Sequence, residues 1–181
     1  FIRSRIATDL PLLAAVIARM NKPGKKILAT GNGKCNFTNN NMDTSRFHGN
    51  IQLIQSVLDR FSKEDTLSFF HEIGIWPKEK NGYYYPNSGQ AASVVEAFNH
   101  ELNRLHVPVY LEQEVLDLFP DKYGFRIKTV QTSYTCRNVI VASGLLAASK
   151  LGSDGSMFSV IKELGHRFVP VLPALCGFYA S

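Results

Sequence analysis

Cysteine and tryptophan are scarce in this chain, and the few cysteines show no metal-binding pattern. The 181 residues include three cysteines and one tryptophan, and no two cysteines stand in a C-x-x-C pair. An odd number of unpaired cysteines argues against a disulfide framework and a zinc site, and it favours a reducing compartment. We therefore expect a cytoplasmic protein that holds no metal ion.

Long hydrophobic runs are also missing. The apolar run at residues 10–18 covers about nine residues and contains Pro11, whereas a helix that spans a bilayer needs roughly 20 apolar residues. The basic start of the chain lacks a convincing cleavage site of small residues, which argues against a signal peptide. We expect no membrane partner.

Blocks of like charge are absent, although the net charge is +5. Lysine and arginine are scattered, and no block is longer than the pair Lys25 and Lys26. Surfaces that bind nucleic acid usually cluster their basic residues, so we expect no nucleic-acid partner. The three tyrosines at 83–85 could stack bases, but a packed aromatic turn explains them more simply. A mild positive charge also suits a phosphate-bearing ligand.

The composition that is present is typical of a globular domain, with 45% hydrophobic and 19% charged residues. Hydrophobic spacing predicts three helices in the first part of the chain, over residues 51–61, 62–73 and 90–105. Ser62 and Asp65 form a capping-box pattern at the start of the second helix, and Gly74 provides its stop. Ser88 is a candidate cap for the third helix.

The second part of the chain is predicted to contain a β-meander followed by a buried strand. Four strands are expected, over residues 107–111, 114–119, 124–130 and 133–142, with a hairpin turn at 120–124. Residues 138–142 are continuously apolar, as expected of a strand that is covered on both faces. The remaining elements are a short buried strand or turn at 25–29, an irregular aromatic segment at 76–86, and a helix over 156–164 closed by Gly165. This order indicates a mixed α/β fold.

Small polar residues are concentrated in one segment, TGNGKCNFTN at residues 30–39. A P-loop is excluded, because Leu28 stands where that motif needs glycine and Cys35 where it needs serine or threonine. Lys34 could lower the pKa of Cys35 and make it a nucleophile, although no histidine is nearby in the sequence. The Asn-Gly pair is a strong turn signal, but a turn alone leaves the residues after it unexplained. Small residues also allow backbone to approach a large planar or phosphorylated ligand, which accounts for the whole segment.

Residues 24–39, GKKILATGNGKCNFTN, closely resemble the signature of the aminoacetone-oxidase-like, or BaiN-like, bacterial flavoproteins. These proteins are NAD(P)/FAD-dependent oxidoreductases, and their pattern is G-K-K-[IL]-L-x-[ST]-G-[NG]-G-[RK]-C-N-x-T-N. Further elements of the family follow in order: FHG at 47–49, YPNSGQA at 85–91, LGSDGS at 151–156 and LGH at 164–166. The resemblance covers roughly residues 16–176.

The resemblance implies part of a two-dinucleotide-binding (Rossmann-like) FAD domain with an inserted antiparallel β-meander. In that arrangement residues 1–181 form a partial FAD-binding domain, and the inserted substrate domain and the last FAD-binding segment lie outside it. Its parts would be a helical segment at 51–105, the β-meander at 107–137, and a return strand and helix at 138–165. FAD would be the cofactor and NAD(P)H a second partner, while the small-molecule substrate is not specified.

The resemblance also implies which residues hold the cofactor. The flavin contacts are Thr30, Gly31, Asn32, Gly33, Lys34, Cys35, Asn36, Thr38 and Asn39. The backbone of Val115 would meet the adenine, and a turn near the cofactor would be formed by Ala142, Ser143 and Gly144. No catalytic acid or base is identified, and His48 and His166 are the only candidates that we consider.

Several positions depart from the family pattern. No G-x-G-x-x-G precedes residue 24, although that motif places a helix N-terminus on the pyrophosphate. Ala18 stands where an acidic residue would bind the ribose, and Leu145 stands where a glycine is expected. Ser149 and Met157 replace a proline and a glycine. These differences concentrate on the phosphates and ribose of the cofactor.

Two functions therefore follow from the sequence. One is an FAD-binding oxidoreductase that is present as an incomplete cofactor domain. The alternative is an inactive, cofactor-free remnant that acts through protein contacts, with self-association favoured by an exposed strand edge.

Overall fold

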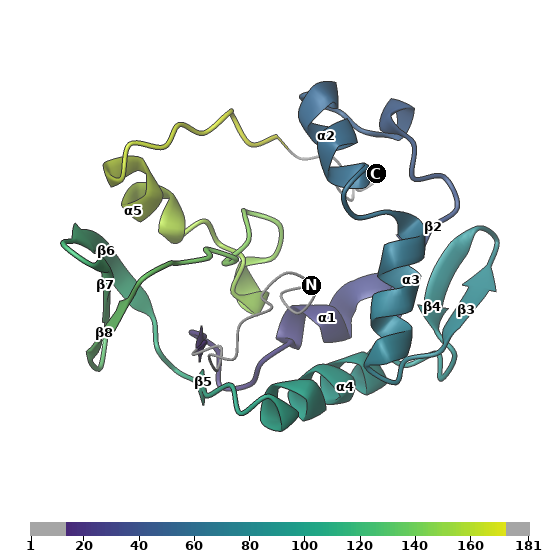
Figure 1. Cartoon of the computed structure of the whole chain (residues 1–181), viewed down its shortest axis with the longest axis horizontal. Helices are drawn as coiled ribbons and strands as arrows, with labels where there is room; N and C mark the ends of the chain where they lie inside the picture. The colour runs from purple at the N-terminus through teal and green to yellow at the C-terminus, as the bar shows by residue number, and fades with distance from the viewer. Residues whose placement is uncertain (1–13, 173–181) are drawn as a thin grey trace, which may run out of the picture. The chain divides into compact units, whose positions relative to one another are not determined.

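The computed structural model of the chain describes residues 14–172, which form two compact units (Figure 1). Within these residues the first unit contains Ala14, Ala15 and Gly24–Pro108, and the second contains Val16–Pro23 together with residues 109–172. Helices and strands occur in both units, so the predicted mixed α/β class is confirmed. No helix within residues 14–172 is long and apolar enough to cross a membrane.

Four α-helices organise the first unit: α1 (Lys25–Ala29), α2 (Ile51–Leu58), α3 (Lys63–Glu72) and α4 (Ala91–Arg104). The predicted capping box of α3 is confirmed, because Ser62 and Asp65 each bind the backbone N–H of the other. Gly74 follows α3 with a φ of 87°, the left-handed conformation that ends helices. The prediction that Ser88 caps α4 is wrong. Gln90 is the N-cap, and the Ser88 hydroxyl lies 2.7 Å from Ser93 Oγ, because the chain turns at Gly89 before the helix begins.

Residues 25–29 were expected to be a short buried strand or turn, but they form a helix, and all five residues of α1 are half-buried or exposed. Gly24 starts this helix in the left-handed conformation, with a φ of 73°. A Cβ added to Gly24 would lie 3.0 Å from a methyl carbon of Val95, so the chain approaches α4 too closely for a side chain. Close packing against α4 therefore overrides the strand-like pattern of the short Ile-Leu-Ala run.

The core of the first unit lies between its helices and includes the aromatic residues of α3. The rings of Phe37 and Phe70 are stacked with centroids 4.1 Å apart. The buried residues of this cluster are Cys35, Phe70, Ile75, Ala91 and Val94. Burial of these apolar side chains is the main force that holds the helices together.

A three-stranded antiparallel sheet completes the first unit, in the order β2-β4-β3, formed by β2 (Thr38–Asn39), β4 (Tyr83–Pro86) and β3 (Pro77–Lys80). Figure 1 shows β3 and β4 as a hairpin beside α3. The expectation that residues 76–86 are irregular is thus wrong, because most of them form β3 and β4. Asn81 and Gly82 both adopt left-handed conformations, with φ values of 53° and 84°, and an Asn-Gly pair in this geometry is a strong hairpin signal.

The second unit contains the predicted meander, which forms a sheet in the order β6-β7-β8: β6 (Val115–Asp121), β7 (Gly124–Thr129) and β8 (Ser133–Cys136). Asp121 pairs with Gly124 at the predicted hairpin turn. Two short strands, β1 (Val16–Ile17) and β5 (Val109–Tyr110), pair in parallel. Helix α5 (Met157–Glu163) packs Met157 and Val160 against Leu118 of β6.

The predicted return strand at residues 138–142 is not formed. In the described part of the chain the last strand ends at Cys136, and irregular backbone follows. Ile140 is 82% exposed, although a strand covered on both faces would bury it. The physical reason is that strand structure depends on a hydrogen-bonded neighbour, and none of the described strands pairs with 138–142.

Candidate functional site

The glycine-rich stretch forms a tight loop that the chain closes with its own hydrogen bonds. A 3₁₀ segment, Thr30–Gly33, contains Gly31 and Asn32 in the left-handed conformation, each with a φ of 55°. The Thr30 hydroxyl donates to the Ile27 carbonyl oxygen at 2.7 Å, and the Cys35 N–H donates to the Thr30 carbonyl oxygen at 3.0 Å. Residues 30–34 are all exposed. The loop therefore presents a fixed backbone to solvent.

Glycine is required at position 31 for two reasons. An added Cβ would lie 2.8 Å from the Asn36 backbone nitrogen, which is closer than real Cβ contacts allow. The φ of 55° is also strained for most residues with a side chain. The same Cβ would lie 3.5 Å from Cε1 of Tyr85, so the loop passes directly beside the hairpin.

Two residues of the stretch point into the protein instead. Cys35 is 7% exposed and belongs to the apolar core cluster of the first unit. Its thiol is therefore shielded from ligands, and a contact between Cys35 and a cofactor would have to come from its backbone. This burial does not favour a nucleophilic role for Cys35.

Thr38 is equally buried, at 7% exposed. Its hydroxyl oxygen has no hydrogen-bond partner among residues 14–172. Buried hydroxyl groups are normally paired, so this oxygen is an exception to the usual pattern.

Backbone pairing joins the glycine stretch to the hairpin. The Phe37 N–H donates to the Tyr84 carbonyl oxygen at 3.0 Å, and the Asn40 N–H donates to the Gly82 carbonyl oxygen at 2.8 Å. Thr38 pairs with Tyr84 in the antiparallel register. The structure thus brings TGNGKCNFTN next to the strand that leads into YPNSGQA, a motif far away in the sequence, whose first residue Tyr85 lies beside Gly31. Sequence reasoning missed this contact, although the Asn-Gly turn could have indicated the hairpin.

A groove with a volume of about 740 Å³ lies where the loop and the hairpin meet. It is lined by Gly31, Asn32, Lys34, Lys78, Lys80, Asn81, Tyr83, Tyr85, Pro86, Asn87, Ser88 and Gly89. None of these residues, all within the described part of the chain, is acidic. Volumes of this order are typical of sites for small ligands and cofactors.

The other expected contacts belong to the second unit. Val115 begins β6, is half-buried and pairs with Thr129, next to a register shift in the strand. Ala142, Ser143 and Gly144 are exposed, irregular backbone, and Gly144 has a φ of 81°. The glycine stretch belongs to the first unit, so these four residues are grouped with a different part of the chain.

Sequence reasoning also missed an ion-pair cluster in the second unit. Arg19 follows directly after the position at which an acidic residue was expected, and its guanidinium donates to Asp154 Oδ2 at 2.7 Å. Glu114 Oε1 lies 3.6 Å from the same nitrogen. The hydrogen bond from Arg19 lowers the pKa of Asp154 to about 2. This cluster attaches the end of β1 to the LGSDGS motif.

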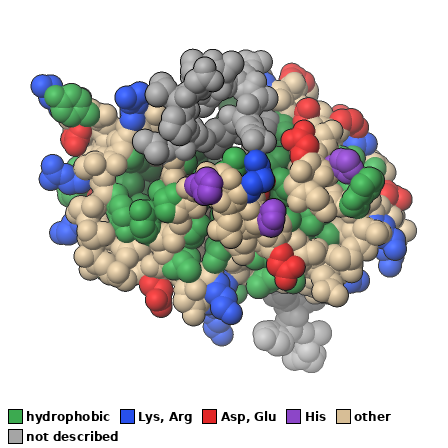
Figure 2. All heavy atoms as spheres, turned by 60° about the horizontal axis from the view of Figure 1, so that its bottom comes forward, with side chains coloured by type: hydrophobic (Ala, Val, Ile, Leu, Met, Phe, Trp, Pro, Cys, Tyr) green, Lys and Arg blue, Asp and Glu red, His purple; other side chains and the backbone are tan. Residues whose placement is uncertain are grey.

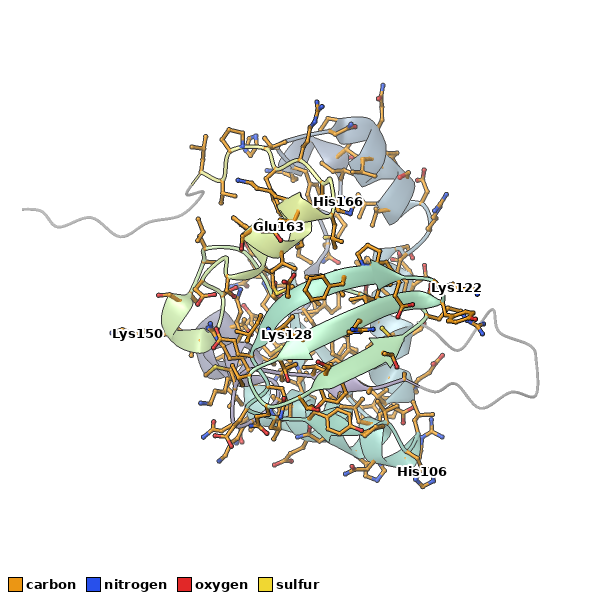
Figure 3. The ribbon with its side chains drawn as sticks, turned by 90° about the vertical axis from the view of Figure 1, so that its left-hand side faces the viewer. His106, Lys122, Lys128, Lys150, Glu163 and His166 are labelled. Carbon is orange, nitrogen blue, oxygen red and sulfur yellow. The ribbon has the colours of Figure 1, made fainter. Side chains whose placement is uncertain are left out.

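The two candidate histidines occupy the surface of the chain. His48 is exposed in a loop of the first unit, and His166 is exposed after α5, where Figure 3 shows it at the end of the helix. Neither lines the groove in the part of the chain that the structure describes. Within the same residues, no group of three or more His, Cys, Asp or Glu side chains is placed to hold a metal ion.

Comparison with known proteins supports the resemblance. A family model described as the HI0933-like protein Rossmann domain matches residues 6–174. The chain is 42% identical over 161 residues to a 3-dehydro-bile acid delta(4,6)-reductase of Clostridium scindens, a match that covers 88% of this chain and 39% of that protein.

Two further relatives are named ribosomal RNA dihydrouridine synthases. The protein of Haemophilus influenzae is 30% identical over 163 residues, and that of Escherichia coli is 28% identical over 159 residues. Each match covers 87% of this chain and 40% of the relative, so the chain spans about two-fifths of the length of these proteins. The expected flavoprotein family and Rossmann-like fold are confirmed: the chain belongs to the HI0933-like protein Rossmann domain family.

Proposed function

We propose that this chain is an FAD-binding domain of an oxidoreductase and that the flavin ring lies against the loop at residues 30–34. The observation that carries the proposal is the exposed, left-handed backbone of this loop, which stands beside an open groove. Small residues with exposed backbone allow a planar ring to approach closely.

The residues of the first unit fit such a ligand. The amide side chains of Asn32 and Asn36 are exposed at this loop, and Asn32 also lines the groove. These groups suit the polar edge of a heterocycle. The Lys34 ammonium group would neutralise negative charge there, while bound FAD would supply the redox chemistry.

The proposal extends to the second unit. The backbone of Val115 would contact the adenine, and Ala142, Ser143 and Gly144 would form a turn near the cofactor. The partial domain would comprise the helical segment at 51–105, the meander at 107–137 and the segment at 138–165. NAD(P)H is proposed as a second partner and the cytoplasm as the compartment, in keeping with the free thiols of Cys35 and Cys136.

The affinity for FAD is expected to be low. The side chain of Ala18 cannot accept a hydrogen bond from a ribose hydroxyl, and Arg19 beside it is bound to Asp154. Each factor of ten in affinity corresponds to about 1.4 kcal/mol, so the loss of one charged contact raises the dissociation constant substantially. We expect a dissociation constant above about 1 μM.

The proposal is tested by adding FAD to the purified 181-residue chain and recording flavin absorbance and fluorescence. Saturable changes that weaken in Lys34→Glu, but not in the matched surface variant Lys162→Glu, are the expected result. A flavin spectrum that stays identical to that of free FAD throughout the titration would contradict the proposal.

A second candidate function rests on exposed hydrophobic side chains. Figure 2 shows hydrophobic side chains reaching the surface in several patches. Ile140, Val169 and Leu172 are 82%, 83% and 79% exposed, and a partner that covered these apolar side chains would remove them from water. The alternative is a cofactor-free protein that acts through protein contacts, including self-association. Sedimentation at several protein concentrations would reveal association, and an absence of flavin binding in the same sample would favour this alternative.

A further inference from the structure

The carboxyl end of the parallel strand pair β1 and β5 carries a charged cluster that contains two carboxylates. In open sheets of parallel strands, ligands bind outside the carboxyl ends of the strands. The Gln113 N–H donates to the Ala18 carbonyl oxygen at 3.0 Å. The Glu112 N–H donates to the Met20 carbonyl oxygen at 3.3 Å. Residues 112–114 therefore pass beside the position where the sequence lacks its expected acidic residue.

The two carboxylates of this cluster differ in how many of their oxygens are available to a ligand. Asp154 uses both, because Oδ2 accepts from the Arg19 guanidinium at 2.7 Å and Oδ1 accepts from the Ser156 N–H at 3.1 Å. Glu114 Oε1 lies 3.6 Å from the same guanidinium nitrogen, which is longer than a normal hydrogen bond. Glu114 Oε2 has no partner among residues 14–172, and the side chain is 44% exposed. Glu114 is therefore the carboxylate that a ligand can reach.

The surrounding contacts hold Glu114 at this end of β1. Its carbonyl oxygen accepts a hydrogen bond from the Val130 N–H at 3.0 Å, which fixes the backbone. The preceding Gln113 is buried, and its amide oxygen accepts from the Thr129 hydroxyl at 2.6 Å. The positive charge of Arg19 attracts the Glu114 carboxylate toward the strand end. A fixed segment thus presents the carboxylate, as a specific binding site requires.

An available carboxylate at the end of a parallel strand matches the chemistry of a ribose. Carboxylate oxygens accept hydrogen bonds from hydroxyl groups, and a ribose offers two neighbouring hydroxyls. In dinucleotide sites such a carboxylate follows the glycine-rich turn by about 20 residues, and in this chain Ala18 stands at its place. Glu114 directly precedes Val115, whose backbone is proposed to contact the adenine. Since the ribose is joined directly to the adenine, these adjacent residues match adjacent parts of one ligand.

We propose that Glu114 binds the ribose hydroxyls of the adenosine half of FAD and replaces the acidic residue that is missing at Ala18. This assignment rests on the proposed function, because it concerns the same cofactor. Arg19 is a positioning residue, since it holds Glu114 by its charge and is itself fixed by Asp154. Arg19 also competes with the ribose for this carboxylate, so the contact restores only part of the affinity. The site should therefore prefer a ribose to a 2′-deoxyribose.

The proposal is tested by NMR titration of the isotope-labelled 181-residue chain with ADP and 2′-deoxy-ADP. ADP carries the adenosine and pyrophosphate of FAD without the flavin, so its binding does not depend on the loop at residues 30–34. ADP should shift the amide signals of Glu114 and Val115 saturably, and 2′-deoxy-ADP should bind about threefold to tenfold more weakly. Glu114→Gln should weaken ADP by about tenfold, the order expected for one charge-assisted hydrogen bond, and should abolish the preference for ribose.

Glu112→Gln is the matched control, because Glu112 is an exposed carboxylate on the same segment. It should leave the affinities for both nucleotides unchanged. A merely structural role of Glu114 would weaken ADP and 2′-deoxy-ADP by the same factor, so the ratio of the two affinities separates ribose recognition from lost packing. Arg19→Lys keeps the positive charge and should preserve this ratio, whereas Arg19→Gln should lower it. Circular dichroism establishes that each variant is folded.

Four results would overturn the proposal. They are no saturable shift by ADP in the second unit, equal affinities for ADP and 2′-deoxy-ADP, an equal loss in Glu112→Gln, and a ribose preference that survives Glu114→Gln. The flavin proposal is tested separately with FMN, which lacks adenosine, so its binding should depend on Lys34 and not on Glu114. If FMN does not bind while ADP shows the ribose preference, the assignment of the loop fails and that of Glu114 stands.

Discussion

The backbone N–H of Phe37 lies 3.0 Å from the carbonyl oxygen of Tyr84 and donates a hydrogen bond to it. This bond holds the end of the glycine stretch against the hairpin and makes them two walls of one groove. The side chain of Phe37 stacks on Phe70 of α3, so the same residue ties the groove to the core. The site is therefore positioned by the packing of the first unit.

The close approach at Gly31 predicts a specific loss of stability. Gly31→Ala should destabilise the chain by about 2 kcal/mol, because it combines a left-handed conformation with a steric clash. The clash is with the Asn36 backbone nitrogen, 2.8 Å from the added Cβ. Urea denaturation measures the change.

Gly74→Ala is the matched control for this prediction. Gly74 has a φ of 87°, but a Cβ there would meet nothing within 4 Å among the described residues. It should cost about 1 kcal/mol from backbone strain alone. Equal losses in the two variants would contradict the proposed clash at Gly31.

The ion pair between Arg19 and Asp154 predicts a pH dependence of stability. The hydrogen bond from Arg19, together with that from the Ser156 N–H, lowers the pKa of Asp154 from 3.8 to about 2 in the folded chain. Because the folded-state pKa is below the unfolded-state value, the pair stabilises the fold above pH 3.8, and this contribution is lost as the pH falls through about 2. Asp154→Asn should reduce stability at neutral pH and flatten this part of the profile.

Denaturation midpoints measured across this pH range for the wild-type chain and Asp154→Asn test the prediction. Asp65 also has a lowered pKa, chiefly through its hydrogen bond with the Ser62 backbone N–H, so some acid sensitivity should remain in the variant. If the two profiles are parallel down to about pH 2, the ion pair does not contribute.

The capping box of α3 predicts how much stability is lost when the Ser62 hydroxyl is removed. Ser62 Oγ accepts a hydrogen bond of 3.1 Å from the Asp65 N–H at the start of the helix. Ser62→Ala should lower the free energy of unfolding by about 1 kcal/mol, because an N-terminal N–H loses its partner. Ser68→Ala, at an exposed position within the same helix, should be neutral or slightly stabilising. Thermal denaturation of both variants provides the comparison. Equal melting temperatures for the two variants would contradict the role of the cap.

The burial of Cys35 predicts protection from thiol reagents. Cys35 should react with a maleimide only when the first unit opens, so its labelling should be slow in buffer and fast in denaturant. Cys136 is half-buried, and burial raises the pKa of its thiol, so its labelling should accelerate at alkaline pH. Peptide mapping by mass spectrometry distinguishes the sites. Rapid labelling of Cys35 in the folded chain would show that its thiol reaches solvent.

Local signals in the sequence were sufficient for much of the helical structure. The capping pattern at Ser62 and the stop at Gly74 act within a few residues, so α3 could be predicted closely. The segment 138–142 could not, because an apolar run forms a strand only where another strand pairs with it. The run at 25–29 became a helix for a similar reason, since its packing against α4 is a tertiary contact.

The candidate site was predicted in part. The composition of residues 30–39 indicated backbone available to a ligand, and the exposed loop agrees with that interpretation. The inward positions of Cys35 and Thr38 depend on backbone conformation and strand pairing, which composition does not specify. The lysines of β3 were not considered, because the hairpin that orients them was not recognised.

Hydrogen exchange at the ladder between β2 and β4 can report whether a ligand occupies the groove. The amide protons of Phe37 and Asn40 are bonded to backbone carbonyl groups of the hairpin, and the hairpin also carries the tyrosines of the groove. A ligand that holds the hairpin in place would suppress the opening of this ladder and slow the exchange of both protons with deuterium. Isotope exchange at two backbone positions can therefore register binding of a colourless ligand that no change in the visible spectrum would reveal.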